Sequence, residues 1–503
     1  MATHYIYRSL ILCLLALLLT CLGAPRQAGA TTTAAGGSSS TAGSAAGTTG
    51  IPILRVALNE GVPGASFSVA QGSYTLTDES TGVSLGTAAP SGAWTITAAG
   101  TTMLVQGPGG NSAQPYNGPI ALQAASGGSG GDQPDLFCYK GVQYRGSLVI
   151  QILNKNLLVL NVLDVESYLY GVVGEEMGGG APSGAYCAQA VASRSYALSM
   201  RGLLSPWYDV STGSQAYGGY TGEQEFAGSG DNPVVDAVQR TSGQVLEYAG
   251  ALVRAYFHAN AGGYTEDAEN VWAISEPYLK GVPSDGDAYA DTLGSWAQST
   301  YTWTETCDRS DLGAQLGVGK ILDIKASCNR TQVTTDPATG STTVQFIPGT
   351  ATVSGRVTQL TVVGTNGTMT YNRDNIRQAL GLKSTLFDVD VGGQLEALDA
   401  QGQTDALSGD EVCVQGQDGP QQTVSLGSGS LYILGSGNRL VTQSASSDEI
   451  TFSGHGDGHG VGMSQWGAIG MAENGDNYQT ILELYYDQGK NDGNLQIVNN
   501  YGA

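Results

Sequence analysis

The periodicity of the apolar residues changes along this chain, and that change decides its fold class. From Ile51, β-branched and aromatic residues alternate with polar ones in short runs such as SFSVAQGSYTLTD, separated by Gly, Asp and Ser. Such runs are typical of hairpins built from short strands. At residues 183–202 the apolar positions instead recur at helical spacing, between Ser183 as a candidate N-cap and Gly202 as a terminator. We therefore expect an α+β fold, with a β-rich N-terminal region and a mixed core whose few short helices line a cleft.

Four further segments refine this expectation. Asn154-Lys155-Asn156 separates two apolar runs and predicts a hairpin turn. Residues 374–389, 462–475 and 478–490 show helical spacing. Most of the other residues beyond Ile51 alternate in polarity or are rich in glycine, so we expect strands and loops there.

The N-terminal residues predict export. An apolar run from Leu10 to Leu22 is followed by Ala28-Gly29-Ala30, a small-x-small cleavage site, so residues 1–30 resemble a secretory signal peptide. A retained membrane anchor and lipidation at Cys21 are open alternatives. We expect a location outside the cell or in the cell envelope.

Composition then divides the rest of the chain. Residues 31–50 hold almost no bulky apolar side chains, which predicts a flexible low-complexity linker. A Gly- and Ser-rich patch ends the first group of hairpins near residue 134. We therefore assign 51–134 to a β-rich N-terminal region and 135–495 to the core.

Charge and cysteine content exclude some classes of function. The 503 residues include 44 acidic and 21 basic side chains, a formal charge of −23, so nucleic acid is not an expected partner. Cys307 and Cys328 are candidates for a disulfide, although connectivity cannot be deduced from sequence alone. No C-x-x-C motif occurs, so a structural zinc site of the usual spacing is not expected.

The stretch VVGEEMG contains the most suggestive acidic residues, Glu175 and Glu176. A pair of adjacent glutamates is most often a solvated turn, so this stretch alone decides nothing. Cys187 lies among alanines on the expected helix and is better explained as a small buried side chain than as a nucleophile. Neither a G-x-S-x-G motif nor a phosphate-binding loop of the G-x-x-x-x-G-K-[ST] type is present.

The histidines fall in two glycine-rich places. His258 lies in YFHANAGGY, and His455 and His459 lie in GHGDGHGVGMSQWG. Paired metal ligands four residues apart need a helix, which the alternating glycines oppose. A glycine loop that places His459 and Gln465 beside a cleft is the more plausible functional arrangement, with a structural role as the alternative.

Six segments, in this order, resemble the family of stage II sporulation protein D and the amidase enhancers. They are LDVESYLYGVVGEEM, CAQAVASRSYAL, HANAGGYTEDAENVW, SGRVTQLTVVGTNG, IRQALGLKSTLFDV and GHGVGMSQWGAIGMAENG. The resemblance covers roughly residues 135–490. It implies that 135–495 is a catalytic core of the sporulation protein D type.

Members of the sporulation type are lytic transglycosylases, which cut the bond between N-acetylmuramic acid and N-acetylglucosamine and leave a 1,6-anhydro sugar. The resemblance places the catalytic acid at Glu176 and a cleft arginine at Arg194, for which a salt bridge to Asp164 or Glu166 is the alternative. It also suggests further substrate-binding residues, with packing or capping as open alternatives for the first two: Gln189, Tyr217, His258, His459 and Gln465.

This chemistry needs one carboxyl group where ordinary glycosidases use two. Glu176 would protonate the departing glycosidic oxygen and then accept the proton of the muramic C6 hydroxyl. That hydroxyl is part of the same sugar, so its attack has the advantage of an intramolecular reaction. We expect Glu175 to point elsewhere and stay solvated.

The implied partners are peptidoglycan glycan strands and, as a further candidate, a cell-wall amidase; no cofactor is implied. Some family members bind zinc through Cys and His before a Gln-x-Tyr motif, but here residues 211–215 contain neither, so no metal site is expected. Asp457 stands where the family usually has an aromatic residue. The main alternative is a non-catalytic amidase enhancer that binds wall glycan or an amidase; an inactive structural relative is a third.

Overall fold

The computed structural model describes residues 50–499 apart from short gaps at 91, 111–112, 126–133, 228–230, 392–394, 399–403, 408–410, 415–421, 426–429, 436–438 and 445–447. The expected signal peptide and nearly all of the expected linker lie outside the described residues. None of the described helices combines the length and apolar character needed to cross a bilayer. The described residues form both short helices and many small sheets, which confirms the α+β class.

The chain divides into two compact units. One contains the described residues up to Phe257 together with those from Met471 onward, and the other is His258–Gly470. The boundary expected at residue 134 does not coincide with this division. Strand β1 (Ile53–Val62) pairs antiparallel with β12 (Asn156–Asp164), so the N-terminal hairpins share a sheet with residues of the expected core.

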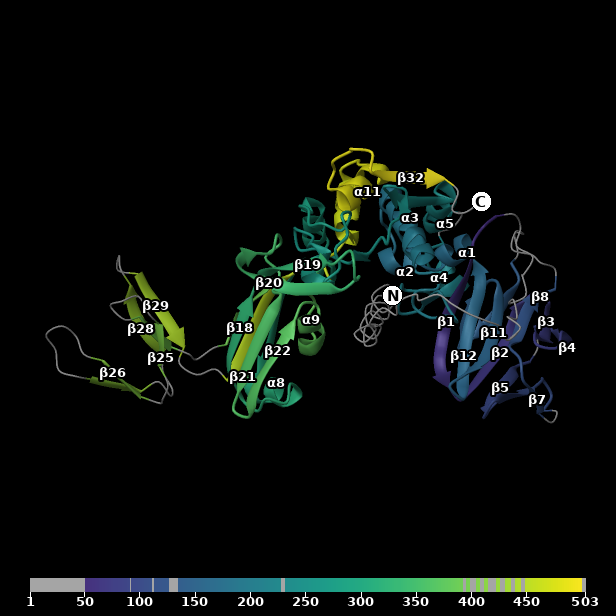
Figure 1. Cartoon of the computed structure of the whole chain (residues 1–503), viewed down its shortest axis with the longest axis horizontal. Coiled ribbons are helices and arrows are strands. Elements are labelled where there is room, and N and C mark those ends of the chain that lie inside the picture. Colours follow the sequence, from purple (N-terminus) through teal and green to yellow (C-terminus); the bar gives the residue numbers. More distant parts are fainter. Residues whose placement is uncertain are drawn as a thin grey trace. The chain divides into compact units, whose positions relative to one another are not determined.

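The first unit is built on two antiparallel-rich sheets. A seven-stranded sheet has the order β13-β1-β12-β11-β8-β3-β4, and a six-stranded sheet has the order β10-β9-β2-β5-β6-β7. Figure 1 shows β1, β12 and β11 side by side, with α1 and α4 near one end of these strands. The remaining strands are β2 (Gly64–Gln71), β3 (Tyr74–Asp78), β4 (Val83–Ala88), β5 (Trp94–Ala99), β6 (Thr102–Gln106), β7 (Gln114–Tyr116), β8 (Ile120–Ala124), β9 (Leu136–Tyr139), β10 (Val142–Tyr144), β11 (Ser147–Leu153), β13 (Val210–Ser211), β14 (Gln244–Tyr248), β15 (Ala251–Leu252) and β32 (Leu495–Asn499).

Local sequence explains two of the first unit's elements. The expected turn at Asn154-Lys155-Asn156 is confirmed: Asn154 and Lys155 both have positive φ, at 53° and 65°, and join β11 to the antiparallel β12. Two successive residues of positive φ match the twist of a tight hairpin. The expected helix at 183–202 is α3, and its alanines are buried on every side. The helices of this unit are α1 (Val165–Tyr170), α2 (Val173–Met177), α3 (Ser183–Ser199), α4 (Gly219–Glu225), α5 (Pro233–Arg240) and α11 (Tyr478–Asp487).

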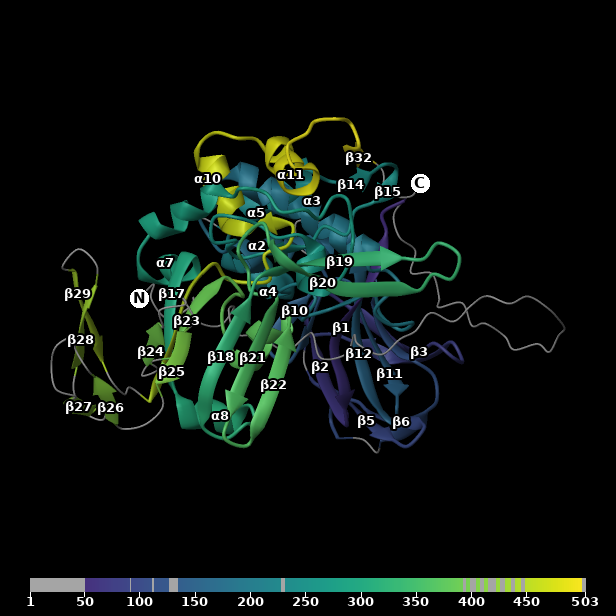
Figure 2. The same cartoon turned by 60° about the vertical axis from the view of Figure 1, so that its left-hand side comes forward.

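The second unit has smaller sheets around its own core. Figure 2 shows β18, β21 and β22 side by side, and the two-stranded ribbon β19–β20. A cluster that includes Trp303, Leu360 and Phe452 fills the core. Its elements are β16 (Phe257–His258), α6 (Ala268–Trp272), the 3-10 helix η2 (Asp285–Thr292), α7 (Ser295–Tyr301), β17 (Thr302–Asp308), α8 (Arg309–Gln315), β18 (Ile321–Ser327), β19 (Asn329–Thr335), β20 (Thr342–Ala351), β21 (Gln359–Gly364), β22 (Gly367–Asn372), α9 (Asn375–Leu380), β23 (Phe387–Asp390), β24 (Leu395–Leu398), β25 (Thr404–Leu407), β26 (Glu411–Val414), β27 (Gln422–Ser425), β28 (Ser430–Gly435), β29 (Arg439–Ser444), β30 (Glu449–His455), β31 (Met463–Ser464) and α10 (Gln465–Glu473), whose last turn passes into the first unit.

Two expectations for this unit need correction. The helix expected at 374–389 ends at Leu380, because Gly381 takes a left-handed conformation (φ 70°) and the chain then continues as the extended β23, which pairs with β30. Cys307 and Cys328 are free thiols rather than a disulfide. The expected helices at 462–475 and 478–490 are present as α10 and α11.

The C-terminal end of α11 makes stability depend on pH. Asp487 is fully buried, and burial together with the nearby charges of Asp492 and Glu483 raises the pKa of Asp487 to about 6, against the opposing effect of Lys490. The folded state therefore holds this proton more tightly than the unfolded chain, so the stability contribution is present at low pH and is lost as pH rises through about 6.

We expect Asp487→Asn to raise the melting temperature relative to the parent protein at pH 7.5, because the amide carries no charge to bury. The difference should shrink toward pH 4, where the parent carboxyl is protonated. Thermal melts followed by circular dichroism at four pH values between 4 and 7.5 test this. A difference that is the same at every pH would contradict the titration of Asp487.

Candidate functional site

Glu176 lies on α2, a one-turn helix between two glycine-containing segments. The apolar residues of this stretch, Val172, Val173 and Met177, are buried, and Glu176 itself is half-buried. The Glu176 Oε1 atom accepts a hydrogen bond of 2.6 Å from the backbone N–H of Ala216. The structure thus holds this carboxylate by a main-chain donor from a distant loop.

Glu175 has different surroundings. A Cβ atom added to Gly218 or Gly222 would overlap the Glu175 carboxylate, so this side chain packs closely against the backbone at the start of α4. Glu175 is half-buried rather than solvated, which corrects the expectation from the sequence. The two adjacent carboxylates therefore contact different parts of the first unit.

Two phenols share an electrostatic environment with Glu176. Burial raises the pKa of Tyr168 well above its usual value near 10, and the charge of Glu176 raises it further. Burial also raises the pKa of Tyr196, with smaller contributions from Tyr256 and from Glu176. Both phenols therefore stay protonated at neutral pH, and the Tyr168 hydroxyl donates to Gln215 Oε1. The sequence reasoning did not select either tyrosine, although Tyr168 lies inside the segment LDVESYLYGVVGEEM.

The loop that supplies the Ala216 donor is anchored on both sides of that residue. Buried Gln215 donates to the Ser193 carbonyl of α3 at 3.2 Å and accepts from the Tyr168 hydroxyl at 3.4 Å. On the other side, the Gly218 N–H donates to the Gly171 carbonyl at 2.9 Å. These contacts fix the position of the Ala216 N–H.

The assignment of Arg194 as a cleft residue is not supported by its position. Arg194 is fully buried, and it binds Glu166 through two hydrogen bonds, Nε to Oε1 at 2.9 Å and Nη2 to Oε2 at 2.6 Å. Its Nη1 donates to the Gln244 carbonyl at 3.1 Å. A guanidinium with no exposed surface is not placed to contact a sugar. The salt bridge to Glu166, which the sequence left as an alternative, is what the structure shows.

Gln189 and Tyr217 also have packing roles. Gln189 is fully buried on α3 and donates to the Ser193 hydroxyl at 3.0 Å. The Tyr217 hydroxyl donates to Asn161 at 2.7 Å, and its ring packs 4.9 Å from that of Tyr168, centroid to centroid. We correct the assignment of Gln189 as a substrate contact because it has no exposed surface. For Tyr217 the structure shows the packing alternative.

Two of the histidines of the second unit, His258 and His459, both bond to the backbone of Val461. The Val461 N–H donates to His459 Nδ1 at 3.1 Å, and the Val461 carbonyl lies 3.2 Å from His258 Nδ1, which donates to it. Burial, with the nearby positive charges, lowers the pKa of His258 well below its usual value near 6.5, so His258 is neutral. The His459 ring packs 4.6 Å from that of Trp272. Gln465, at the start of α10, is buried.

Asp457, the residue that replaces the usual aromatic, belongs to the same region of the second unit. Its backbone forms an isolated β-bridge with Asn260, and burial raises the pKa of the Asp457 carboxyl. Each compact unit thus holds part of the set that the sequence predicted. Glu176, Gln189, Arg194 and Tyr217 lie in the first unit, and His258, His459 and Gln465 lie in the second.

Comparison with known proteins identifies the segment around Glu176. Residues 153–248 match the sequence model of the family described as stage II sporulation protein. The chain carries a stage II sporulation protein domain. This confirms the family predicted from the sequence motifs. Residues 291–404 match a second family, described as a domain of unknown function.

Full-length relatives agree with the domain match. Over 339 residues the chain is 26% identical to stage II sporulation protein D of Bacillus subtilis, covering 64% of this chain and 73% of that protein. It is 29% identical over 329 residues to the amidase enhancer of Bacillus subtilis, but there the aligned region covers only 39% of the relative. An uncharacterised protein of Brachyspira hyodysenteriae is 27% identical over 357 residues, which cover 70% of this chain and 73% of that protein.

The stage II sporulation protein domain contains four of the predicted site residues: Glu176, Gln189, Arg194 and Tyr217. Of these four, Glu176 is the one whose carboxyl group is half-buried beside a main-chain donor. Gln189 and Arg194 are instead in the interior. Among these four, the geometry leaves Glu176 as a partly exposed acidic side chain, and its catalytic role stays a prediction.

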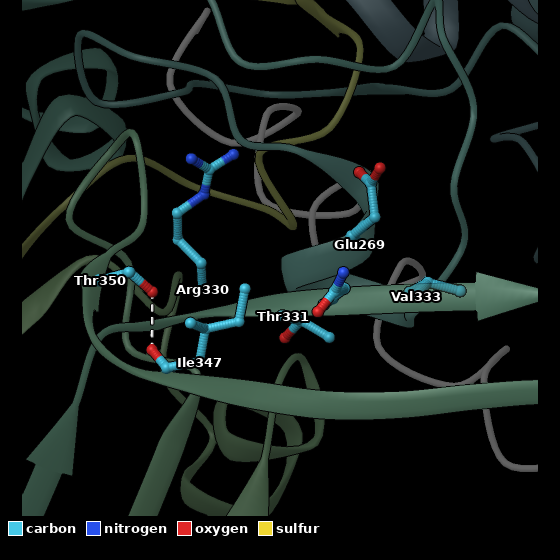
Figure 3. Close-up of a pocket in the computed structure, with 7 residues that line it drawn as sticks. Glu269, Arg330, Thr331, Val333, Ile347 and Thr350 are labelled. Atoms are coloured by element: carbon cyan, nitrogen blue, oxygen red, sulfur yellow. Dashed lines mark hydrogen bonds between the residues drawn. The ribbon is translucent and has the colours of Figure 1, made fainter.

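A hollow of about 300 Å³ in the second unit lies apart from the predicted residues. Figure 3 shows Glu269 and Arg330 among its lining side chains. Both are already paired, Glu269 with Lys280 and Arg330 with Asp267. We assign it no chemistry. Within the described ranges of the chain, no three His, Cys, Asp or Glu side chains are arranged to hold a metal ion.

Proposed function

We propose that this protein is an exported lytic transglycosylase that cleaves the glycan strands of peptidoglycan with Glu176 as its one acid/base. The proposal rests on a difference in contacts between Glu176 and the acidic side chains near it in the sequence. Glu166 is bound by Arg194, and Asp164 caps α1 by accepting the Ser167 N–H at 2.9 Å. Glu175 packs against glycine backbone. These three have structural surroundings. Glu176 is half-buried and accepts its backbone N–H from Ala216 in a distant loop, whereas the donor to Asp164 belongs to the helix that Asp164 caps.

The proposed reaction balances with one carboxyl group. Protonated Glu176 gives its proton to the oxygen that joins C1 of N-acetylmuramic acid to C4 of N-acetylglucosamine, and the C1–oxygen bond breaks. The C6 hydroxyl of the same muramic acid then forms a bond to C1, and its proton returns to the Glu176 carboxylate. The products are a 1,6-anhydro end and a free C4 hydroxyl, and the enzyme is restored without a second carboxylate.

The surroundings of Glu176 support this cycle. Glu176 is half-buried and follows the buried Val172 and Val173, so its carboxyl group lies on a helix that packs against the protein interior. The Ala216 N–H stabilises the carboxylate that forms during cleavage. General acid–base catalysis of this kind contributes a factor of about 10² to 10⁴ in rate.

Product analysis tests the proposal directly. The purified protein is incubated with glycan strands that carry stem peptides and with strands from which these peptides have been removed, and the fragments are examined by mass spectrometry. We expect fragments with 1,6-anhydro ends, which lack the mass of one water relative to hydrolysis products. Fragments with reducing ends would show a hydrolase instead. Binding without any fragments would reject catalysis.

The similarity to the amidase enhancer favours a second candidate, a non-catalytic protein that binds wall glycan or an amidase. The two functions differ in one result. An enhancer would increase the release of stem peptides by an added cell-wall amidase, and the Glu176→Gln variant would do so equally well. Residues 1–30 bear on both proposals, since either function requires export through a signal sequence or a retained anchor.

A further inference from the structure

We infer that Gln215 is a positioning residue for the acid/base: its side chain fixes the loop whose next backbone N–H, that of Ala216, holds Glu176 Oε1. This inference rests on the proposed function. It concerns a residue that does not touch Glu176 by its own side chain. It also concerns a catalytic contact that no side-chain motif reveals, because the donor is a main-chain group.

Gln215 is buried, and both ends of its side-chain amide are hydrogen-bonded. Only 3% of this residue is exposed, so its amide must find partners inside the protein. Its Nε2 donates to the carbonyl of Ser193 on α3, and its Oε1 accepts from the Tyr168 hydroxyl on α1. One side chain therefore ties the loop to two helices of the stage II sporulation protein domain.

The position of Gln215 also sets the direction of the peptide bond between Gln215 and Ala216. The Ala216 N–H belongs to the peptide bond that Gln215 itself begins, and that bond is planar. Fixing Gln215 on one side and Gly218 on the other leaves this N–H little freedom. It donates to Glu176 Oε1 at 2.6 Å, a short hydrogen bond.

This donor affects both the orientation and the charged form of the Glu176 carboxyl group. The Ala216 N–H donates to Glu176 Oε1 and so orients the whole carboxyl group toward one position. The same N–H stabilises the carboxylate that forms when Glu176 gives up its proton.

Gln189 supplies a matched control. It is a second buried glutamine, and it donates to the hydroxyl of the same Ser193 that Gln215 contacts through the carbonyl. Its bond stays within α3 and does not reach the loop. Gln189→Met and Gln215→Met thus each remove a buried amide hydrogen bond at Ser193, but only Gln215→Met releases the Ala216 N–H.

The experiment compares the pH dependence of kcat for the parent and both variants on glycan strands. For Gln215→Met we expect kcat at the optimum to fall about tenfold with KM little changed, because a misplaced carboxyl group reacts poorly. The high-pH limb should move upward by about one pH unit as the carboxylate loses its donor. Tyr168 and Tyr196 stay protonated across this range, and Glu175 keeps its own contacts with α4 in both variants. For Gln189→Met the profile should be unchanged.

A second variant removes the donor alone. An ester bond in place of the 215–216 peptide bond, introduced with the hydroxy-acid analogue of alanine, deletes the N–H and keeps every side chain. It should reproduce the upward pH shift even if Gln215→Met folds poorly. An active ester variant with the parent profile would overturn the inference. A parent protein that releases no anhydro fragments would instead reject the proposed function, so the two failures are distinguishable.

Discussion

Glu176→Gln is expected to lower the release of 1,6-anhydro fragments by about 10² to 10⁴-fold while leaving the fold intact. Glutamine is close to glutamate in size, and its side-chain oxygen can still accept the Ala216 N–H that the structure records at 2.6 Å. It has no proton to give to a glycosidic oxygen. The loss should therefore appear in kcat, with little change in KM or in melting temperature.

Glu175→Gln is the control for this experiment, because it removes the same charge one residue away on the same helix. Glu175 packs against Gly218 and Gly222, so its replacement should alter activity less than threefold, with any small change coming from α4. An equal loss of activity in both variants would mean that activity depends on the total charge of α2 rather than on Glu176 as the acid. Full activity of Glu176→Gln would reject Glu176 as the acid/base.

Arg194→Ala is expected to destabilise the first unit by about 3–5 kcal/mol, because it leaves the Glu166 carboxylate buried without its partner. Glu166 is 6% exposed; it accepts two hydrogen bonds from Arg194, at 2.9 and 2.6 Å, and one from the Gly243 N–H at 3.2 Å. The chain has two compact units, so the measurement should be local. Hydrogen exchange of α1 and α3 peptides should show protection reduced by about 10² to 10³-fold.

The double replacement Arg194→Met with Glu166→Leu separates a structural role from a substrate contact. Replacing both members of a buried ion pair by apolar residues is often neutral, so protection in α1 and α3 should largely return. Activity should return with it if Arg194 acts only through the fold. A stable double variant with a strongly raised KM would instead show that Arg194 contacts the substrate.

Elements with a strong local cause could be predicted from the sequence. The turn at Asn154 and Lys155 and the helix α3 follow from short-range preferences, and both are present. The prediction of a helix over 374–389 was wrong for the residues beyond Leu380. There, pairing of β23 with β30 outweighed the apolar spacing, since strand partners come from elsewhere in the chain.

The same distinction between local and long-range causes applies to the candidate site. Motif order led to Glu176, because a catalytic carboxyl group has to be a particular side chain at a particular place in the chain. The roles of Arg194, Gln189 and Gln215 depend on burial and on partners such as Glu166 and Ser193. The type of a polar residue does not by itself tell whether its side chain faces a substrate or the interior.

What the sequence by itself determined is the α+β class, the family of the domain and the identity of its candidate acid. What only the tertiary structure decided is which neighbours that acid has. The Ala216 N–H is a donor that every residue except proline carries, so no residue letter marks it as a catalytic contact. Its role arises because the folded loop brings it to Glu176, and that approach depends on long-range packing rather than on local preference.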